Sequence, residues 1–444
     1  MANKASPLTL ALEEFSSKIN ERKLQVGIVG LGYVGLPLLM RFCEVGFNVI
    51  GVDASQQRID QIRRGESPIS HISNAAISNT LTTGRCGLTS NFADLQVADA
   101  ILICVPTPLT PNRTPDMDFV RDVAQSIRPF LRLGQIVCLE STVYPGATEE
   151  IFLPILQDAG FTVGMDIFLA YSPEREDPGN VSFSTRNTPK VCGGATDQCT
   201  DRAVSLYSQI TQQVVQVSTI RTAEMTKLLE NIHRCVNIGL VNEMKVVADQ
   251  MDINIHEVIT AAATKPFGFT PYWPGPGLGG HCIPIDPFYM TWKAREFGID
   301  TRFIELAGQV NSAMPDFVVG KIIKALNDQG VALSAAKILV CGLAYKKNID
   351  DFRESPAIAI INRLQKWGAK VDIDDRYVGN KDIYEILEPF MIVDSSRLDL
   401  KSYNCVVIAT DHDYFDYTRI KEDAVAVVDS RGRYQRHFPG LYAA

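Results

Sequence analysis

The chain has 444 residues, of which 46% are hydrophobic and 21% are charged. That length and apolar fraction are typical of a globular protein with two or three domains, each with its own core. The formal net charge of −8 argues against non-specific nucleic-acid binding, which needs a basic surface to displace counterions. Because nothing resembles a membrane span or a secretory signal, we expect a cytoplasmic protein without nucleic-acid or membrane partners.

The ten cysteines are scattered, with neither a CxxC pair nor a metal-ligand spacing. We therefore expect reduced, mostly buried thiols and no metal site. The first 22 residues are polar and weakly amphipathic, and they predict a short helical arm.

The first strong motif is a dinucleotide-binding pattern. An apolar strand, Gln25–Val29, leads into the glycine turn Gly30–Gly35, a helix, a second strand, Asn48–Val52, and then Asp53. Such glycines permit a tight turn, close approach of a pyrophosphate and close helix–strand packing. Asp53 is placed to accept hydrogen bonds from a ribose diol and to repel a 2′-phosphate, which favours NAD over NADP. The alternatives are a glycine turn that only packs, or a methyltransferase that binds an adenosyl ligand.

Further apolar strands, Ala100–Val105 and Ile136–Glu140, alternate with helical patterns, as in a parallel doubly wound sheet. Ligands bind at the carboxyl ends of such strands. The hydroxyl-bearing turns there, Pro106–Pro108 and Ser141–Val143, could line a nicotinamide site or simply cap helices. The charged turn Ser172–Arg175 follows another strand in the same structural position, and a strand at Lys190–Gly193 comes next.

From about Arg221 to Asp249 the pattern predicts one long helix that joins two domains and carries an interface. Its apolar positions follow helical spacing: Met225, Leu228, Leu229, Ile232, Val236, Leu240, Met244 and Val247. Lys227 and Asn231 are four residues apart and share one face. The alternative is a solvated lysine and a surface asparagine.

The segment Trp273–Pro287 is too rich in glycine and proline for a helix or a central strand. Cys282, four residues before Asp286, is a candidate nucleophile because a thiol forms covalent adducts with carbonyl carbons. The alternative is a buried structural cysteine in a tight turn. Helices are expected at about Phe288–Glu296 and Phe303–Asn327.

A second α/β unit begins with the strand and turn Lys337–Lys346, in which Ala344 replaces the middle glycine. Dinucleotide pyrophosphate cannot approach such a turn closely. Lys346, Lys347 and Arg353 instead place cations where a smaller nucleotide's phosphates could bind, or they form a solvated basic cluster. The remaining predicted elements are a helix opened by Arg353–Pro356 and strands at Lys370–Ile373, Cys405–Ala409 and, as the last one, Val425–Asp429.

Together these segments resemble the UDP-glucose/GDP-mannose dehydrogenase family of nucleotide-sugar 6-dehydrogenases over residues 24 to 435. The resemblance rests on Val29–Pro37, Ser141–Val143, Ser172–Arg175, Glu224–Lys227 with Asn231, Gly275–Asp286, and Tyr345–Lys347 with Asp351–Ser355. It implies an α/β fold of two doubly wound Rossmann-like domains joined by a long central helix, with a helical dimerisation region. The expected parts are an N-terminal arm (1–23), an NAD-binding Rossmann domain (24–218), a central helical dimerisation domain with the cysteine loop (219–330) and a UDP-sugar-binding Rossmann-like domain (331–444).

The family chemistry implies NAD-dependent four-electron oxidation of a sugar C6 alcohol to the uronic acid, with two NAD consumed. The aldehyde is captured by Cys282 as a thiohemiacetal, which becomes a thioester that water cleaves. The catalytic residues implied are Cys282, Lys227, Asn231, Asp286, Glu174 and Thr142.

The resemblance also implies a role for each of these residues. Lys227 is expected to stabilise oxyanions at C6, Asn231 to orient the oxygen, and Asp286 to hold or deprotonate water with Lys227. Glu174 resembles the second acid/base residue, and Thr142 positions the water or the nicotinamide.

The resemblance also implies which residues contact the cofactor and the substrate. The expected cofactor contacts are Gly30, Gly32, Tyr33, Val34, Gly35, Asp53, Arg58, Pro106, Thr107, Ser141, Thr142 and Arg353. The expected substrate contacts are Glu174, Arg175, Lys227, Asn231, Tyr272, Pro274, Gly275, Gly277, Gly279, Tyr345, Lys346 and Arg431.

Within the family, the block Pro274–Tyr289 with His281 and Ile285 resembles the branch that acts on UDP-N-acetylhexosamines, and UDP-N-acetylglucosamine is the expected substrate. UDP-N-acetylmannosamine, UDP-N-acetylgalactosamine and UDP-glucose are the alternatives. His281 is expected to be a substrate-pocket or structural residue rather than the base for Cys282, since successive side chains of an extended segment point apart.

Two other classes of protein are alternatives. A non-catalytic NAD-binding scaffold would keep the glycine turn and the long helix, but it would not need Cys282, Lys227 and Asp286 together. A hydroxyacid dehydrogenase of the 6-phosphogluconate type would need neither the thiol nor the second α/β domain. A homodimer or a higher homo-oligomer is expected.

Overall fold

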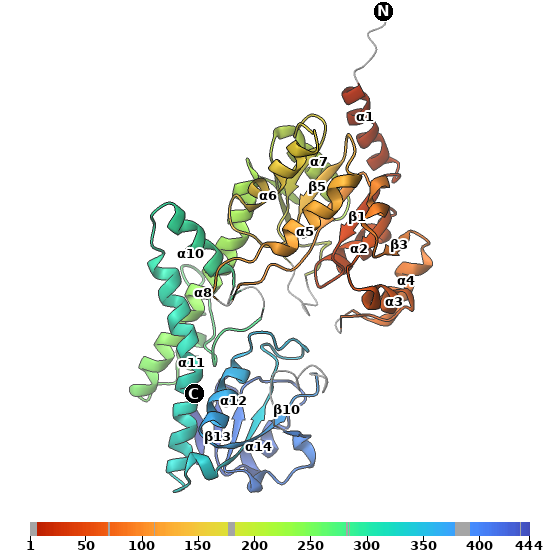
Figure 1. Cartoon of the computed structure of the whole chain (residues 1–444). Helices are drawn as coiled ribbons and strands as arrows, with labels where there is room; N and C mark the ends of the chain where they lie inside the picture. The colour runs from red at the N-terminus through yellow and green to blue at the C-terminus, as the bar shows by residue number, and fades with distance from the viewer. Residues whose placement is uncertain are drawn as a thin grey trace, which may run out of the picture. The chain divides into compact units, whose positions relative to one another are not determined.

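The structure is a computed structural model that describes residues 7–69, 72–110, 112–175, 183–280, 283, 285–377, 391–435 and 437–444. The chain divides into two compact units (Figure 1). Unit 1 comprises Met1–Glu230 and Phe288–Phe297, and unit 2 comprises Asn231–Pro287 and Gly298–Ala444. The helices α8 (Ile220–Gln250) and α10 (Asp286–Glu296) contribute residues to both units.

Unit 1 is built on a sheet which, among the described residues, has eight strands in the order β3-β2-β1-β4-β5-β6-β7-β8. The strands are β1 Gln25–Val29, β2 Asn48–Val52, β3 Cys86–Thr89, β4 Ala100–Ile103, β5 Ile136–Leu139, β6 Phe168–Tyr171, β7 Lys190–Gly194 and β8 Val214–Gln216. The helices are α1 Pro7–Asn20, α2 Gly35–Glu44, α3 Gln56–Arg63, α4 Asn74–Thr82, α5 Asp118–Ile127, α6 Ala147–Asp158 and α7 Asp197–Tyr207, with 3₁₀ turns η1 Phe92–Val97 and η2 Arg128–Phe130. The order reverses direction between β1 and β4, the position where doubly wound sheets bind their ligands.

Two strands of this sheet, β7 and β8, run opposite to the other six and depart from the expected parallel arrangement. β7 pairs antiparallel with β6, while β8 runs parallel to β7. A parallel return requires a crossover of a dozen or more residues, usually a helix. The described part of the connection between β6 and β7 contains no helix. The first residue of β7 therefore lies at the same edge of the sheet as the carboxyl end of β6.

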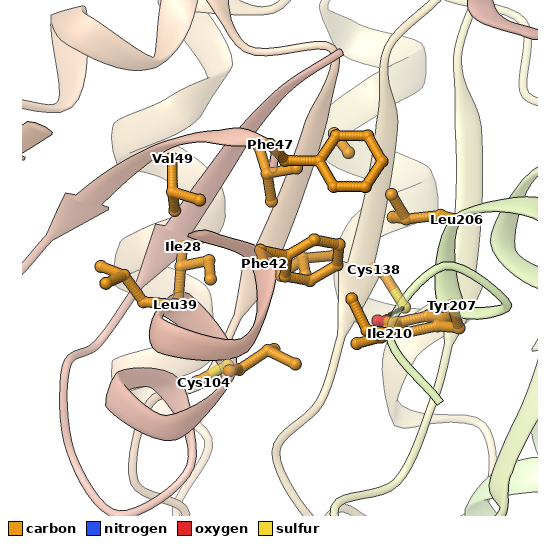
Figure 2. Packing of buried hydrophobic residues seen from close by; sticks show 14 of the residues in the cluster. Ile28, Leu39, Phe42, Phe47, Val49, Cys104, Cys138, Leu206, Tyr207 and Ile210 are labelled. Atoms are coloured by element: carbon orange, nitrogen blue, oxygen red, sulfur yellow. Dashed lines mark hydrogen bonds between the residues drawn. The ribbon is translucent and has the colours of Figure 1, made fainter. Parts of the chain in front are cut away.

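The core of unit 1 lies between the sheet and its covering helices (Figure 2). Ile28 and Val49 from the strands pack with Phe42 of α2, whose ring meets that of Phe47 edge-on at 5.8 Å. The predicted helical arm is helix α1, and its Phe15 is buried in the same core. The arm is thus packed onto unit 1, because its apolar positions face the sheet's covering layer.

Unit 2 contains a parallel sheet which, in the described ranges, has six strands in the order β11-β10-β9-β12-β13-β14. The strands are β9 Lys337–Cys341, β10 Lys370–Asp374, β11 Met391–Ile392, β12 Cys405–Ile408, β13 Val427–Asp429 and β14 Leu441–Ala443. The helices are α9 Ile255–Ala262, α11 Arg302–Asn327, α12 Pro356–Lys366 and α14 Tyr417–Asp423, with 3₁₀ turns η3 Leu333–Ala335, η4 Ser395–Arg397 and η5 Leu400–Ser402. Both Rossmann-like sheets are therefore confirmed.

The prediction that Val425–Asp429 is the last strand is wrong, because β14 follows and pairs parallel with β13. β14 is an edge strand of three residues that contains a tyrosine and an alanine. So short a segment shows no periodicity, and pairing with β13 determines its conformation.

Helix α8 confirms the predicted long helix, but its apolar face points outward. Leu228 is buried, whereas Leu229 and Leu240 are 62% and 56% exposed. Met225, Met244 and Val247 are exposed on the same stripe. The inward face is largely polar instead and carries Glu224, Lys227, Asn231, Cys235, Asn242 and Lys245. Within the described residues, every helix is too short or too polar to cross a membrane.

Inside unit 2, α8 and α11 approach closely at Gly239. A Cβ atom built there would lie 3.2 Å from the Cβ and 3.3 Å from the Cα of Ala307. By contrast, a Cβ at Gly320 of α11 would meet nothing within 4 Å. A glycine inside a helix lowers stability by about 0.5–1 kcal/mol relative to alanine. Of Gly239 and Gly320, Gly239 is the one whose presence is explained by close helix packing.

We expect opposite effects from substitutions at these two glycines. Gly320→Ala should raise the free energy of unfolding by about 0.5–1 kcal/mol, because it removes backbone entropy from the unfolded chain. Gly239→Leu should lower it by about 1–3 kcal/mol, since the two helices must separate. Thermal and denaturant unfolding of both variants test this, and a Gly239→Leu protein as stable as wild type would contradict the close packing.

Candidate active site

The glycine turn of unit 1 has the geometry that its sequence predicts. Gly30 has a φ of +91°, and its N–H donates to Val52 O at 2.8 Å. A Cβ at Gly35 would lie 1.8 Å from Gly30 O, whereas a Cβ at Gly32 would meet no atom of the described residues within 4 Å. Gly35 is therefore required by the protein's own packing, and the space beside Gly32 is available to a ligand. Tyr33 and Val34 pack partly buried against the core.

Asp53 is held directly against this turn. Its Oδ2 accepts from Leu31 N at 2.9 Å, and its Oδ1 accepts from Ser55 N at 2.9 Å. Arg58 Nη1 lies 3.1 Å from Asp53 Oδ2. The structure thus brings together the turn, the predicted ribose acceptor Asp53 and the predicted cofactor contact Arg58, and these residues fit the adenosine half of NAD.

The contrast between the two glycines gives a test of cofactor binding. Gly32→Ala should fold with a melting temperature near that of wild type but bind NAD at least about tenfold more weakly, because the methyl group occupies the pyrophosphate's approach. Gly35→Ala should lower the melting temperature itself. Calorimetric titration with NAD and thermal unfolding measure the two quantities. Unchanged NAD affinity in Gly32→Ala would show that the cofactor does not approach that backbone.

Next, the turns after β4 and β5 are joined by a hydroxyl. Ser141 Oγ donates to Val105 O at 2.6 Å. The N-cap of α6 is Gly146, which makes no side-chain capping bond. Ser141 is therefore not a cap of α6, and the alternative interpretation of this hydroxyl is wrong. Thr107 O accepts from Tyr289 Oη of α10 at 2.7 Å, and Thr142 is partly exposed in the same turn as Ser141.

Glu174 follows β6 and is partly exposed, and its Oε1 accepts from Arg175 N at 2.7 Å. The Arg175 guanidinium lies 2.6 Å from Glu230 of α8 and donates to Pro189 O at 2.7 Å. Arg175, which we predict as a substrate contact, therefore fastens the turn of Glu174 to α8 and to the start of β7.

The inward polar face of α8 supplies the predicted catalytic pair. Lys227 and Asn231 are both buried one helical turn apart. Asn231 Nδ2 donates to Asp286 Oδ2, and Asp286 is buried at the N-terminus of α10. A carboxylate is favoured there by the unpaired N–H groups of the first helical turn.

The same face carries a buried acid, Glu224, which belongs to the sequence motif Glu224–Lys227 but for which no role is predicted. Glu224 accepts from Gly146 N at 2.6 Å and from Thr148 N and Oγ1 at 2.9 and 2.7 Å. Burial raises the pKa of Glu224 to about 7, although the three hydrogen bonds that it accepts lower that pKa in part. The signal in the sequence is the spacing of Glu224, Lys227 and Asn231, which marks a polar stripe on a helix whose other face is apolar.

The glycine-rich loop begins on a chain of buried amides in unit 2. Gly275 N donates to Asn242 Oδ1 at 2.9 Å, and Asn242 Nδ2 donates to Asn311 Oδ1 at 2.8 Å. Asn311 Nδ2 in turn donates to Cys235 O at 3.1 Å. These asparagines, which sequence reasoning missed, fix the start of the loop to α8 and α11.

The rest of the loop packs on the turn after β9. A Cβ at Gly279 would lie 2.5 Å from Tyr345 Cβ, and Gly280 N donates to Arg353 O at 2.9 Å. Gly277 and Gly280 have φ values of +138° and +85°, which side chains rarely adopt. The predicted nucleophile Cys282 and its neighbour His281 lie outside the described residues.

The other predicted substrate contacts lie near this loop or on α8. Arg431 Nε donates to Ala409 O at 2.7 Å, and its Nη1 would lie 3.1 Å from a Cβ at Gly275. Tyr272 Oη and His233 Nδ1 are 2.9 Å apart. Pro274 is buried next to Gly275.

The predicted basic group of unit 2 is largely paired. Arg353 makes two bonds to Asp351, at 2.9 and 2.6 Å, and Lys347 Nζ lies 3.3 Å from Asp413. Lys346 is partly exposed. Both side chains remain about half exposed, at 46% for Arg353 and 52% for Lys347, so the structure leaves open both the phosphate contact and the solvated basic cluster.

The second glycine turn differs from the first in its use of backbone donors. Leu343 N and Ala344 N both donate to Asp375 Oδ2, at 2.7 and 2.9 Å. His412 Nε2 lies 3.0 Å from the same oxygen. A carboxylate of the chain itself therefore fills this turn, in agreement with the expectation that pyrophosphate does not approach it.

A dinucleotide turn with an acid after the second strand, followed by a second α/β unit whose turn is filled by its own carboxylate, indicates an NAD-binding protein with a second Rossmann-like domain. The chain belongs to the UDP-glucose/GDP-mannose dehydrogenase family. The family's NAD binding domain matches residues 24–211, its central domain residues 221–313 and its UDP binding domain residues 339–436. The protein is therefore an NAD-dependent UDP-sugar dehydrogenase.

Individual relatives carry two different sugar names. The chain is 34% identical to a UDP-N-acetyl-D-glucosamine 6-dehydrogenase of Pseudomonas aeruginosa, covering 89% of this chain and 92% of that protein. It is 35% identical to a UDP-N-acetyl-D-mannosamine dehydrogenase of Salmonella typhi, covering 92% and 98%. The solved structure of a UDP-D-ManNAc dehydrogenase from Pyrococcus horikoshii is similar with a TM-score of 0.84 and 29% identity, covering 94% and 98%.

Proposed function

We propose that the protein oxidises the C6 alcohol of a UDP-N-acetylhexosamine to the uronic acid, with UDP-N-acetylglucosamine as its substrate and two NAD reduced per sugar. The observation that carries this proposal is the buried Asn231–Asp286 bond, one helical turn from Lys227 and at the end of the glycine loop that contains Cys282. A non-catalytic scaffold would have no use for this combination.

The cofactor supplies the hydride acceptor for both oxidations. Lys227 is buried, so its ammonium acts at low dielectric and stabilises the oxyanion that develops at C6. Asn231 orients that oxygen while it holds Asp286 in place. The Cys282 thiolate attacks the aldehyde carbon to form a thiohemiacetal, and loss of the second hydride turns this adduct into a thioester.

Hydrolysis of the thioester requires a water molecule and a base. The family resemblance assigns that role to Asp286 and Glu174, and Thr142 lies in the turn that follows β5. Water adds to the thioester carbonyl, the C–S bond breaks, and the Cys282 thiolate leaves. The sum is one alcohol and one water converted to one carboxylate, with four electrons removed.

The choice of an N-acetylated sugar rests on the loop. Ile285 stands directly before Asp286 and is buried, and a neutral side chain there leaves room for a bulkier neutral C2 substituent. His281 supports the same choice by its resemblance to the N-acetylhexosamine branch. UDP-N-acetylmannosamine is the second candidate, because relatives of equal identity carry that name.

We also propose that the protein self-associates through the outward face of α8. Met225, Leu229, Leu240, Met244 and Val247 form an exposed apolar row on that helix. Such a row is typical of a helix that is covered by a second copy. The cytoplasmic location expected from the composition stays a prediction.

The covalent step can be tested by Cys282→Ser. We expect this variant to bind NAD as wild type does and to lose net turnover by on the order of 10³-fold, because an alcohol is a weaker nucleophile and its ester hydrolyses less readily. Cys86→Ser is the control, since Cys86 lies at the start of β3 and should leave turnover unchanged. Full turnover in Cys282→Ser would rule out the thioester route.

The substrate can be tested with four UDP-sugars: those of N-acetylglucosamine, N-acetylmannosamine, N-acetylgalactosamine and glucose. We expect kcat/KM for the best N-acetylated sugar to exceed that for UDP-glucose by roughly fivefold or more, since one buried methyl contact contributes about 1 kcal/mol. UDP-N-acetylglucosamine should rank first, and two NADH should form per acid. A higher kcat/KM for UDP-glucose, or one NADH per product, would contradict the proposal.

A further inference from the structure

A short segment that follows β9 in unit 2 is bound at both ends by two buried side chains. Asp375 Oδ2 accepts from Leu343 N at 2.7 Å and from Ala344 N at 2.9 Å. At the other end, His412 Nδ1 accepts from Asn348 N at 2.9 Å. His412 Nε2 lies 3.0 Å from Asp375 Oδ2, and the two side chains are 0% and 1% exposed. The histidine and the aspartate therefore connect the two ends of the segment.

The segment 343–348 contains Tyr345 and Lys346, the two predicted contacts to the uridine nucleotide. Arg431, a third predicted contact, donates from Nη2 to Tyr345 O at 3.2 Å. Tyr345 N donates to Asp351 O at 3.0 Å. The backbone that carries the predicted contacts is thus fixed in its middle as well as at its ends.

The hydrogen bonds of His412 also determine which ring nitrogen carries the proton. A backbone N–H can only donate, so Nδ1 accepts from Asn348 and Nε2 carries the hydrogen that points to Asp375. Each nitrogen of the ring therefore serves one end of the segment, and a side chain with one polar atom could not do both.

Asn348 is held by its side chain too. Its φ is +61°, in the left-handed region that asparagine adopts more readily than most residues. Asn348 Oδ1 accepts from Asp413 N at 3.1 Å, and Nδ2 donates to Asp413 Oδ2 at 2.6 Å. Two successive residues, His412 and Asp413, therefore fix the backbone and the side chain of Asn348.

The glycine turn of unit 1 shows what the histidine adds. There Asp53 accepts from Leu31 N, and the side chain that pairs with Asp53 is Arg58, which is 43% exposed. A carboxylate with a half-exposed partner therefore suffices to hold such a turn. In unit 2, the buried ring of His412 adds a bond to Asn348 N, four residues beyond the turn, which the turn itself does not require.

A fixed segment favours binding of a nucleotide through a long side chain. Ordering a loop and a lysine on binding reduces affinity, and a loop that is already ordered avoids part of that loss. Lys346 is partly exposed, and it lies between Tyr345 and the anchored Asn348. The position of its backbone therefore depends on the bond to His412.

We propose that His412 is a positioning residue for the UDP-sugar. Its bonds hold the segment 343–348 in the conformation that presents Tyr345 and Lys346 to the nucleotide. The inference rests on the proposed function and on the predicted contacts of these two residues. His412 is buried and acts through the segment rather than by touching the ligand.

Two substitutions separate the two bonds of His412. His412→Gln keeps an N–H donor for Asp375 but leaves Asn348 N without its acceptor, whereas His412→Asn keeps an acceptor oxygen near the position of Nδ1. We expect UDP to bind His412→Gln roughly tenfold more weakly than wild type and to bind His412→Asn within about threefold of wild type. Calorimetric titration with UDP measures both affinities. Wild-type affinity in His412→Gln, or equal losses in both variants, would overturn the proposal.

A merely structural role would not separate the two ligands or the two kinetic constants. NAD affinity should stay within about twofold of wild type in both variants. With UDP-N-acetylglucosamine, His412→Gln should raise KM roughly tenfold and change kcat by less than about twofold, since the reacting atoms are untouched. Ile361→Ala is the control, because a cavity at this buried position of α12 should lower the melting temperature and leave UDP affinity unchanged. An equal loss of UDP affinity in this control would contradict a specific role for His412.

Hydrogen exchange tests the same bond without any substitution, in case the His412 variants do not fold. The side chain of Asn348 is exposed, so its amide would exchange rapidly if it had no acceptor. We expect the Asn348 amide of the wild-type protein to exchange at least about tenfold more slowly than an unprotected amide. Mass spectrometry with fragmentation locates this amide. Exchange at the unprotected rate would overturn the proposal.

Lys346→Met separates this inference from the prediction on which it rests. UDP is the probe, so the result does not depend on which sugar the enzyme oxidises. If Lys346→Met binds UDP as wild type does, the predicted contact is wrong, and the proposal for His412 fails with it. If Lys346→Met weakens UDP binding while His412→Gln does not, the contact stands and the proposal for His412 alone is overturned.

Discussion

The structure depends on a helix whose polar face is buried. Placing Glu224, Lys227, Asn231, Asn242 and Lys245 on the inward side of α8 would cost several kcal/mol for each unpaired group. Hydrogen bonds therefore fix what lies against this face. Glu224 caps α6, Asn231 holds Asp286, Asn242 holds the glycine loop, and Lys245 donates to Ser430 O at 3.2 Å. One face of one helix thus positions elements from three separate stretches of the chain: the start of α6, the segment Trp273–Pro287 and the turn at Ser430.

That constraint explains which features could be predicted from the sequence. Hydrophobic periodicity predicts α8 to within one residue at each end. The same periodicity does not show that the apolar face of this helix points outward. The strands β1, β2 and β9 were predicted within their bounds because their apolar runs are bounded by glycine or acid. β3, β8 and β14 were not found, since they are edge strands of three or four residues with mixed composition.

The candidate site divides in the same way. Some site residues belong to short sequence motifs that indicate their function without any long-range contact. These are the glycine turn, Asp53, Lys227, Asn231 and Asp286. The pairs Asn242–Asn311 and Glu140–Lys190 join residues 69 and 50 positions apart, and each member alone is an unremarkable polar side chain. Only the antiparallel entry of β7 brings Lys190 to the edge that Glu140 and Glu174 share, and no local pattern encodes that direction.

The two glycine turns show how one backbone design serves two ligands. In unit 1, Asp53 accepts from Leu31 N, and within the described part of the chain no atom lies within 4 Å of a Cβ built at Gly32. In unit 2, Asp375 accepts from both Leu343 N and Ala344 N, and His412 fixes the same carboxylate oxygen. A pyrophosphate at the second turn would have to displace a buried carboxylate from two donors. The second turn is therefore occupied by a carboxylate of the chain itself, and the glycine loop packs against Tyr345 in the same unit.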